Sequence, residues 1–187
     1  MKKMLSIDGS TTSAGYSLIT IYKDNTFSVK DSGFIKPSDA PKSGKLTTLK
    51  AKREYRQINM ATHMMFIIDE INSILLSQKP DIIVIEDTYL GKDPNAYKWL
   101  CRLQGVLIGY SKTNNLDFFC VAPSHWRKIL GIPSKDGNKF LKRPELKRLS
   151  LAYVKEKLHI SVTNEDQAEG VLIGVSKCTE MGYNIRK

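Results

Sequence analysis

Four acidic residues in this sequence occupy positions that are poor for packing and well suited to ligand binding. Asp8 follows the apolar run at residues 4–7, and Glu86 ends a second apolar run. Because ligands of open α/β sheets bind beyond the carboxyl ends of strands, we expect Asp8 and Glu86 to share one sheet edge. Asp166 and Glu169 lie three residues apart near the start of a predicted helix, so they share one helix face. If that helix packs across the sheet edge, the four carboxylates meet in a small volume.

Such a cluster would repel itself strongly unless cations neutralise it. Its ligands are carboxylate oxygens, with no His or Cys among them, which favours Mg²⁺ or Mn²⁺ over zinc. Two such ions about 4 Å apart activate a water molecule and stabilise the leaving oxygen in phosphodiester cleavage. We therefore expect two Mg²⁺ ions per site, with Mn²⁺ as a substitute.

The turn after Asp8 supports two interpretations. Gly9, Ser10 and Gly15 allow the backbone to turn tightly and to approach a phosphate group closely. An ordinary polar hairpin tip would have the same composition.

The acids of the last helix also have a simpler explanation. Asn164 and Gln167 have the spacing of a capping box, and acids in the first turn of a helix favour its dipole. Capping alone would therefore explain Asp166 and Glu169. Two apolar strands that each end on an acid are harder to explain by packing, so the joint pattern favours a metal site.

The hydrophobic pattern predicts a mixed α/β layered domain. Three strands are expected first, two of them in a hairpin over residues 4–19 and the third over residues 26–35. Two more apolar runs, typical of strands buried on both faces, are expected at residues 81–86 and 117–122. Apolar residues at helical spacing and helix-start signals predict five helices, over residues 51–78, 95–112, 123–130, 144–158 and from 164 onward. Residues 36–50 and 131–143 are rich in turn-forming residues and are expected to form loops.

The composition is that of a globular protein, with 41% apolar and 26% charged residues. A length of 187 residues suits one domain, 1–187, with a sizeable core. No run of about 18 apolar residues and no apolar signal region is present, so we expect no membrane segment and a cytoplasmic protein. The three cysteines are scattered and form no Cys-x-x-Cys pair, which argues against zinc and disulfides.

The net charge of +10 comes from two segments. Residues 36–56 hold seven Lys or Arg and two acids, residues 123–157 hold ten and three, and the remainder is slightly acidic. A basic surface beside an acidic centre suits a protein that binds a polyanion around a metal site. General solubility charge is the other explanation, but it does not account for the segregation.

Three motifs resemble, in order, those of the RuvC-type Holliday junction resolvases, over essentially the whole chain. They are Ile7-Asp8 with Gly9-Ser10 and Gly15-Tyr16, then Ile85-Glu86 with Tyr89 three residues on, and finally Asp166-Gln167-Ala168-Glu169-Gly170. The order of the predicted elements is that of the ribonuclease H-like fold. In that fold a mixed central sheet has three antiparallel strands, then parallel strands, with helices on both faces. The last motif departs from the family's Asp-x-Ala-Asp-Ala at Glu169, which lengthens the metal arm, and at Gly170, which mildly weakens the helix.

The resemblance implies an endodeoxyribonuclease that resolves four-way (Holliday) and other branched DNA by paired symmetric nicks. Asp8 would bridge two metal ions, Glu86 would hold one, and Asp166 with Glu169 would hold the other. Hydrolysis would leave a 5′-phosphate and a 3′-hydroxyl. The enzyme would be a homodimer with helix 95–112 in the dimer contact, although the apolar stripe of that helix is equally explained as core.

The resemblance also suggests DNA contacts. Tyr89 would stack on an unpaired base at the junction centre, or be a partly exposed tyrosine at the rim. The expected phosphate contacts are Arg127, Lys128, Lys142, Arg143, Lys147 and Arg148. Together they would make binding steeply salt dependent. Trp126 is interpreted as a packing residue. The lysine-rich loops resemble those of compact phage variants, for which the compartment would be the cytoplasm of the bacterial host.

Other functions stay open. A non-catalytic module that binds branched DNA would keep the charge without needing four acids. An actin-like or sugar-kinase-type phosphotransferase shares the Asp-Gly-x-Thr-Thr stretch at residues 8–12, but it needs a second domain that this length does not provide. Within the nucleases, RNA–DNA hybrid is the alternative substrate.

Overall fold

The computed structural model describes residues 1–37, 48–90 and 93–186. Most of the predicted loop at residues 36–50 lies outside these ranges. Among the described residues, no helix is both long enough and apolar enough to cross a membrane.

A six-stranded mixed sheet forms the centre of the molecule, in the order β5-β4-β1-β2-β3-β8. The strands β1 (Lys2–Gly9), β2 (Ala14–Ile21) and β3 (Thr26–Ile35) form an antiparallel meander. On the other side of β1, the strands β4 (Ile82–Glu86) and β5 (Asp117–Val121) run parallel to it. This confirms the predicted strands and the neighbouring positions of the strands that end at Asp8 and Glu86.

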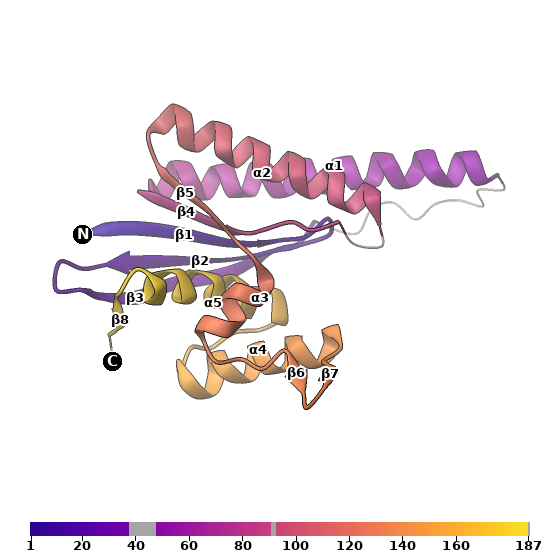
Figure 1. Ribbon diagram of the computed structural model, residues 1–187. Helices are drawn as coiled ribbons and strands as arrows, with labels where there is room; N and C mark the ends of the chain where they lie inside the picture. The colour runs from indigo at the N-terminus through magenta and orange to yellow at the C-terminus, as the bar shows by residue number, and fades with distance from the viewer. Residues whose placement is uncertain (38–47, 91–92, 187) are drawn as a thin grey trace.

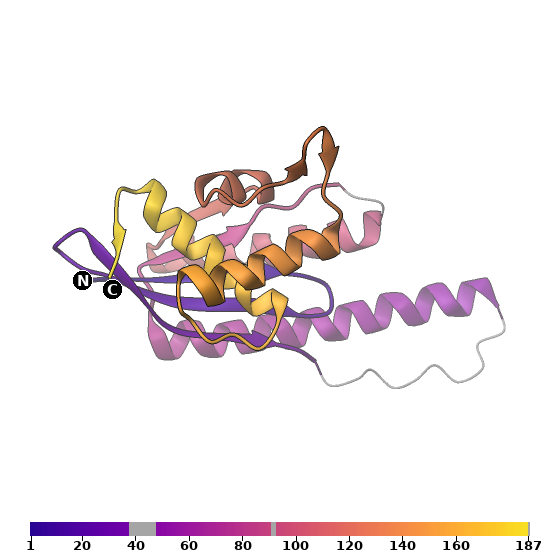
Figure 2. The same cartoon turned by 90° about the horizontal axis from the view of Figure 1, so that it is seen from below.

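Helices cover both faces of the sheet, as predicted (Figures 1 and 2). The helices α1 (Leu49–Gln78) and α2 (Pro94–Asn114) cover one face, and α3 (Pro123–Ile129), α4 (Arg143–Lys157) and α5 (Glu165–Glu180) cover the other. Side chains alternate between faces along a strand, so each strand contributes to both cores. In β1, Leu5 packs with the residues of α1 and α2, whereas Met4 packs with those of α3, α4 and α5.

Helix α5 lies unusually close to the sheet because two glycines meet there. A Cβ atom on Gly15 would come within 1.7 Å of the Asp166 carbonyl oxygen, and one on Gly170 within 2.7 Å of Gly15. The hydroxyl of Ser6, buried in β1, donates to the Gly170 carbonyl at 2.7 Å and bonds the Ser17 hydroxyl at 2.6 Å. Gly15 therefore serves the approach of a helix rather than that of a phosphate, and Gly170 is required for packing rather than being a simple weakness.

The structure also contains short strands that the pattern did not predict. Within the expected loop at residues 131–143, β6 (Lys135–Asp136) and β7 (Lys139–Phe140) form a small antiparallel hairpin, so that prediction was wrong at these residues. Near the C-terminus, β8 (Asn184–Ile185) pairs with the start of β3. The predicted helices agree with the observed bounds to within two residues.

Candidate active site

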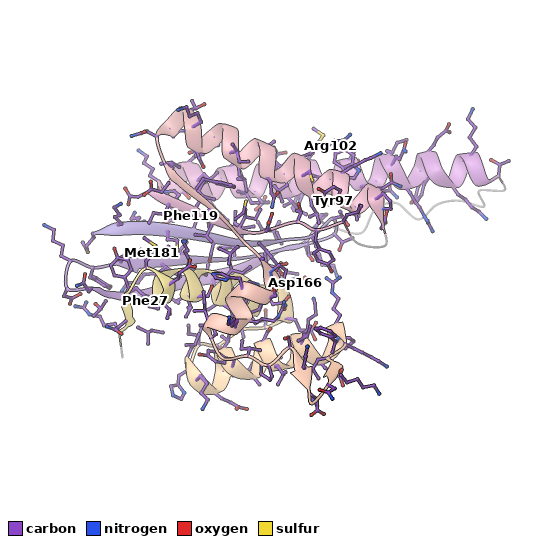
Figure 3. All side chains as sticks on the ribbon, in the orientation of Figure 1. Phe27, Tyr97, Arg102, Phe119, Asp166 and Met181 are labelled. Carbon is purple, nitrogen blue, oxygen red and sulfur yellow. The ribbon has the colours of Figure 1, made fainter. Side chains whose placement is uncertain are left out.

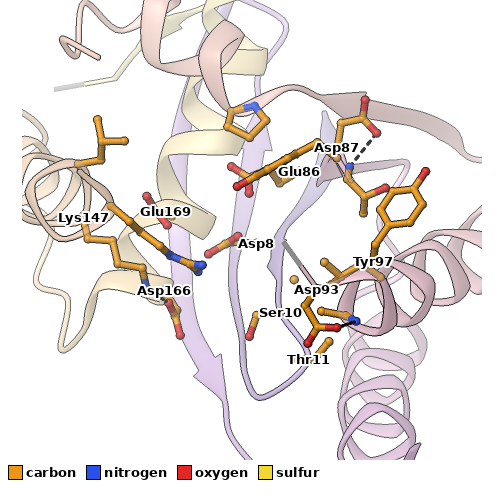
Figure 4. Close-up of a pocket in the computed structure, with 18 of the residues that line it drawn as sticks. Asp8, Ser10, Thr11, Glu86, Asp87, Asp93, Tyr97, Lys147, Asp166 and Glu169 are labelled. Carbon is orange, nitrogen blue, oxygen red and sulfur yellow. Dashed lines mark hydrogen bonds and ion pairs between the residues drawn. The ribbon is translucent and has the colours of Figure 1, made fainter. Parts of the chain in front are cut away.

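A pocket of about 510 Å³ opens where β1 and β4 end, and all four predicted carboxylates line it. Figure 4 shows Asp8 with Glu86, Asp166 and Glu169 around it. Asp8 and Glu86 are adjacent because β1 and β4 are paired up to Ile7 and Ile85, and each acid follows directly. Asp166 and Glu169 reach the same place from the start of α5. Tyr97 of α2 and Asp166 of α5, both labelled in Figure 3, are among the residues that line this pocket.

Asp8 lies buried at the centre of this acid cluster. Its side chain is 8% exposed, and burial raises the pKa of its carboxyl well above the ordinary value. The negative charges of Glu86, Glu169 and Asp166 raise that pKa further. The charge of Lys147 acts in the opposite direction but only partly compensates, so a cation beside Asp8 would be strongly stabilised.

Glu86 receives a hydrogen bond from an indole. The Trp126 Nε1–H donates to Glu86 Oε1 at 2.8 Å, and the tryptophan is fully buried. Burial raises the pKa of Glu86 to about 7, although the indole hydrogen bond acts in the opposite direction. The interpretation of Trp126 as a packing residue was therefore incomplete. The signal for its second role was a buried tryptophan, whose N–H needs an acceptor.

Asp166 is held by two donors. Lys147 Nζ donates to its Oδ1 at 2.6 Å, and the Ser13 hydroxyl donates to its Oδ2 at 2.6 Å. Burial alone would raise the pKa of Asp166, but these two hydrogen bonds, together with the positive charges of Lys147 and Arg143, outweigh burial and lower it. The same contact keeps the pKa of Lys147 raised even though burial acts against it.

Glu169 is paired with a buried guanidinium. Arg127 Nη2 donates to Glu169 Oε1 at 2.8 Å, and the Ser150 hydroxyl donates to the same oxygen at 3.3 Å. The Arg127 guanidinium also lies over the Trp126 ring, 4.1 Å from its centroid. Two consecutive residues of α3 therefore hold two of the four acids, Glu86 through the indole and Glu169 through the guanidinium.

The donor set suits a hard divalent cation, because it consists of carboxylate oxygens around the buried Asp8. In the arrangement of the described residues, no three of the His, Cys, Asp and Glu side chains converge tightly enough to form a metal-binding group. Lys147 and Arg127 supply positive charge at Asp166 and Glu169 instead. The carboxylates can bind metal ions provided that Lys147 and Arg127 release Asp166 and Glu169.

The capping prediction for α5 is half right. The Asn164 side chain caps the helix by accepting from the Gln167 N–H at 2.9 Å. The Gln167 side chain does not return to Asn164 but accepts from the Thr163 N–H and hydroxyl, both at 2.9 Å. Capping thus uses Asn164, which leaves the carboxylates of Asp166 and Glu169 to the pocket.

The structure separates the predicted DNA contacts into two groups. Tyr89, Arg127, Arg143 and Lys147 line the pocket, and Tyr89 is 71% exposed. The exposed residues Lys128, Lys142 and Arg148 do not line it. Sequence reasoning missed Ser13 and Ser150 as partners of the acids, because their hydrogen bonds span 153 and 19 residues of sequence.

No protein-family model matches the chain. In sequence, it is similar to the crossover junction endodeoxyribonuclease RuvC of Fusobacterium nucleatum, with 24% identity over 121 residues. That match covers 65% of this chain and 54% of the relative, so the chain spans about half the length of the curated relative it matches.

Solved structures are similar over nearly the whole chain. RuvC of Thermus thermophilus, solved with a Holliday junction substrate, matches with a TM-score of 0.59 and 10% identity, covering 96% of both chains. The fowlpox virus resolvase, solved with Holliday junction DNA, has a TM-score of 0.57, 13% identity and 96% and 98% coverage of this chain and its own. The yeast mitochondrial resolvase Ydc2 has a TM-score of 0.53, 19% identity and 95% and 78% coverage. In fold and in sequence, this chain therefore resembles the RuvC-type Holliday junction resolvases, as its three motifs predicted.

Proposed function

We propose that this protein is a metal-dependent, structure-selective endonuclease that resolves four-way DNA junctions, and other branched DNA, by paired symmetric nicks. The most direct support is the meeting of four carboxylates, from β1, β4 and α5, in one pocket at the carboxyl edge of the sheet. These acids lie far apart in the sequence, and proteins solved with junction DNA share the fold that gathers them.

The four carboxylates would hold two Mg²⁺ ions, with Mn²⁺ as a substitute. Asp8 would be shared between the ions, Glu86 would bind one, and Asp166 with Glu169 would bind the other. Ions bound there supply a nucleophilic water and neutralise the charge that develops on the phosphate. In-line hydrolysis of the phosphodiester would leave a 5′-phosphate and a 3′-hydroxyl.

The cations that pair with the acids would have a second task. When Asp166 and Glu169 take up metal, Lys147 and Arg127 lose their partners inside a pocket that they line together with Arg143. Their charges would then bind the DNA phosphate that enters the pocket. Tyr89, at the rim, would stack on an unpaired base. The exposed Lys128, Lys142 and Arg148 would bind phosphates farther from the cut.

The partner protein would be a second copy of the chain, bound through α2. The solvent side of this helix exposes Val106 and Ile108, 41% and 50% accessible, which lie on opposite flanks of the strip that Gly105 and Gly109 form. Gly105 and Gly109 leave open space beside them, with no atom within 4 Å of an added Cβ. A two-fold pair of such faces would bury the apolar side chains of both copies and place two active sites on one junction.

A non-catalytic module that binds branched DNA is the second candidate, and one observation favours it. Lys147 forms an ion pair with Asp166, and Arg127 forms one with Glu169. A protein that only bound DNA could keep this arrangement permanently.

Cleavage of an end-labelled four-way junction in Mg²⁺ distinguishes the two candidates. Linear duplex and RNA–DNA hybrid of matched sequence are the substrate controls, and Asp8→Asn is the protein control. We expect paired nicks in the junction only, and we expect Asp8→Asn to lose cleavage while still binding. Tight junction binding without cleavage in Mg²⁺ or Mn²⁺ would refute the nuclease and favour the binding module. Cleavage of the RNA–DNA hybrid instead of the junction would support the metal site but refute the junction as the substrate.

The described residues form one central six-stranded sheet with helices on both faces, which supports a single nuclease domain over residues 1–187. Its place of action is expected to be the cytoplasm of a bacterium, or of the host cell if a phage encodes it.

A further inference from the structure

The β6–β7 hairpin presents an aromatic ring to solvent. Phe140 is 73% exposed, the largest accessible fraction of any aromatic side chain in the described ranges, and it belongs to neither core cluster. The next most exposed aromatic side chain is Tyr89, which lines the acidic pocket. A single exposed ring is common on protein surfaces, so its meaning depends on what surrounds it.

The hairpin holds this ring in a defined position. Lys135 pairs with Phe140 and Asp136 with Lys139, which leaves a two-residue turn. Gly137 opens the turn with a φ of +56°, a conformation that suits glycine and tight hairpins. The Lys135 ammonium lies over the Phe140 ring, 4.4 Å from its centroid. One face of the ring is thus paired with a cation, and the side chain remains largely open to solvent.

Basic residues surround the ring and connect it to the pocket. Exposed Lys135, Lys139, Lys142 and Arg143 stand against a single acid, Asp136, in this segment. Arg143 starts α4 and lines the acidic pocket, three residues after Phe140. Figures 1 and 2 both show the hairpin projecting away from the body of the molecule, next to the start of α4. An exposed aromatic ring among cations is the combination that binds unpaired nucleotides, by stacking and by phosphate contacts.

We propose that Phe140 stacks on an unpaired or helix-end base at the branch point of the DNA, while Lys139 and Lys142 bind the flanking phosphates. This inference rests on the proposed function, because a branch point supplies the free base. Bases inside a continuous duplex are stacked on both sides and offer no face to the ring. Phe140 therefore contributes selectivity for branched DNA, whereas the lysines contribute affinity for any DNA.

The test uses the full chain and DNA with 2-aminopurine, in Ca²⁺ or EDTA to prevent cleavage. One substrate is a four-way junction with the fluorescent base at the branch point, and the other is a duplex with the same sequence around it. The variants are Phe140→Ala, Phe140→Leu and Phe140→Trp. Phe34→Ala is the matched control, because Phe34 is 41% exposed but lines a different pocket, between β3 and α1.

We expect Phe140→Ala and Phe140→Leu to weaken junction binding by about 5- to 50-fold and to reduce the change in 2-aminopurine fluorescence. Phe140→Trp should retain both, and duplex binding should change by less than about twofold. Lys139→Gln should weaken junction and duplex binding alike and lower the salt slope by about one. Phe34→Ala should behave as the unsubstituted protein.

Two results would overturn the inference alone: junction binding by Phe140→Ala equal to that of the unsubstituted protein, or an equal loss on junction and duplex. If the unsubstituted protein does not prefer the junction over the duplex, the proposed function fails and the inference falls with it. Unchanged thermal stability of Phe140→Ala, expected for an exposed side chain, would exclude misfolding as the cause of a loss.

Discussion

Burial of the Glu86 carboxylate in the pocket lowers the stability of the folded protein at neutral pH. Its pKa is raised to about 7 from an ordinary value of 4.5. The folded chain therefore binds this proton more tightly than the unfolded chain does. The contribution to stability is fully present below about pH 4.5 and is lost as the pH rises through 7. A shift of this size corresponds to roughly 3 kcal/mol.

We therefore expect Glu86→Gln to be more stable than the unsubstituted protein at pH 7.5 in the absence of divalent ions. The amide carbonyl still accepts from Trp126, so the substitution removes charge with little change in packing. Thermal unfolding should show a Tm several degrees higher for the variant at pH 7.5 and a much smaller difference near pH 4.5. Added Mg²⁺ should raise the Tm of the unsubstituted protein only, because binding to the native state stabilises it. A lower Tm for the variant at pH 7.5 would contradict the buried, strained position of this acid.

Trp126 gives a second prediction at the scale of one residue. Its N–H fixes one oxygen of Glu86 at 2.8 Å, so its loss should leave the acid free to turn. Groups that orient a metal ligand in this way typically change metal affinity by about 10- to 100-fold. We expect Trp126→Phe, which keeps an aromatic ring, to raise the Mg²⁺ concentration needed for cleavage by that factor. Mn²⁺-dependent thermal shifts would measure the same loss without relying on activity.

Phe27→Leu is a suitable control for Trp126→Phe. Phe27 is buried in the same core cluster, but Figure 3 shows it at the far end of the sheet from Asp166. Its substitution should lower the Tm without changing the metal dependence of cleavage. An equal metal dependence in Trp126→Phe and the unsubstituted protein would reduce Trp126 to a packing role.

At the scale of elements, the contact between α5 and β2 decides where two of the acids lie. A methyl group at Gly170 would come within 2.7 Å of the Gly15 backbone, so the helix must shift away from the strand. Alanine is otherwise favoured over glycine in a helix by about 1 kcal/mol. We expect Gly170→Ala nevertheless to destabilise the protein by about 1 to 3 kcal/mol and to reduce cleavage. Gly109→Ala, on an open surface of α2, should not destabilise the protein when measured by the same denaturation curves.

The same contact shows how far the sequence alone could predict this molecule. Local patterns sufficed for the strands that end at Asp8 and Glu86 and for the apolar faces of the helices, because these depend on periodicity. They also sufficed to suggest that four acids meet. The approach of Gly15 to Gly170 could not be predicted, because it joins residues 155 positions apart and only the folded chain shows its distance.

The two-residue strands and the partners of the buried acids could not be predicted from the sequence, for the same physical reason: both depend on contacts that only the folded chain makes. Strands of two residues, such as β6, β7 and β8, have no periodicity, and pairing with a neighbour defines them. The ion pair of Arg127 with Glu169 likewise depends on how α3 packs against α5. From the sequence, Arg127 was therefore predicted to contact a DNA phosphate and not an acid of the site.

At the scale of the whole molecule, the net charge of +10 should govern DNA binding. Each phosphate contact releases counterions, so the logarithm of the binding constant falls with the logarithm of salt by about 0.9 per contact. We expect the double variant Lys142→Gln and Arg148→Gln, in exposed residues outside the pocket, to lower this slope by about two. Titrations of the junction from about 50 to 200 mM salt would measure it. An unchanged slope would show that DNA binds elsewhere on the surface.

Paired nicks require two pockets on one junction, and the exposed face of α2 is the surface expected to join them. Glutamate in place of Val106 or Ile108 would put a charge opposite its own copy across a two-fold axis and remove apolar contact from both chains. We expect Val106→Glu and Ile108→Glu to shift the protein toward monomer in sedimentation or light-scattering measurements while its Tm at low concentration changes little.

On a plasmid with an extruded cruciform, such monomers should give nicked circles, whereas the dimer gives linear DNA from two coupled cuts. Leu76→Glu, at a 67% exposed apolar position on α1, is the matched control and should leave both the mass and the coupling unchanged. A dimer that persists in both α2 variants would place the contact on another face, and coupled cutting by a true monomer would remove the need for a dimer.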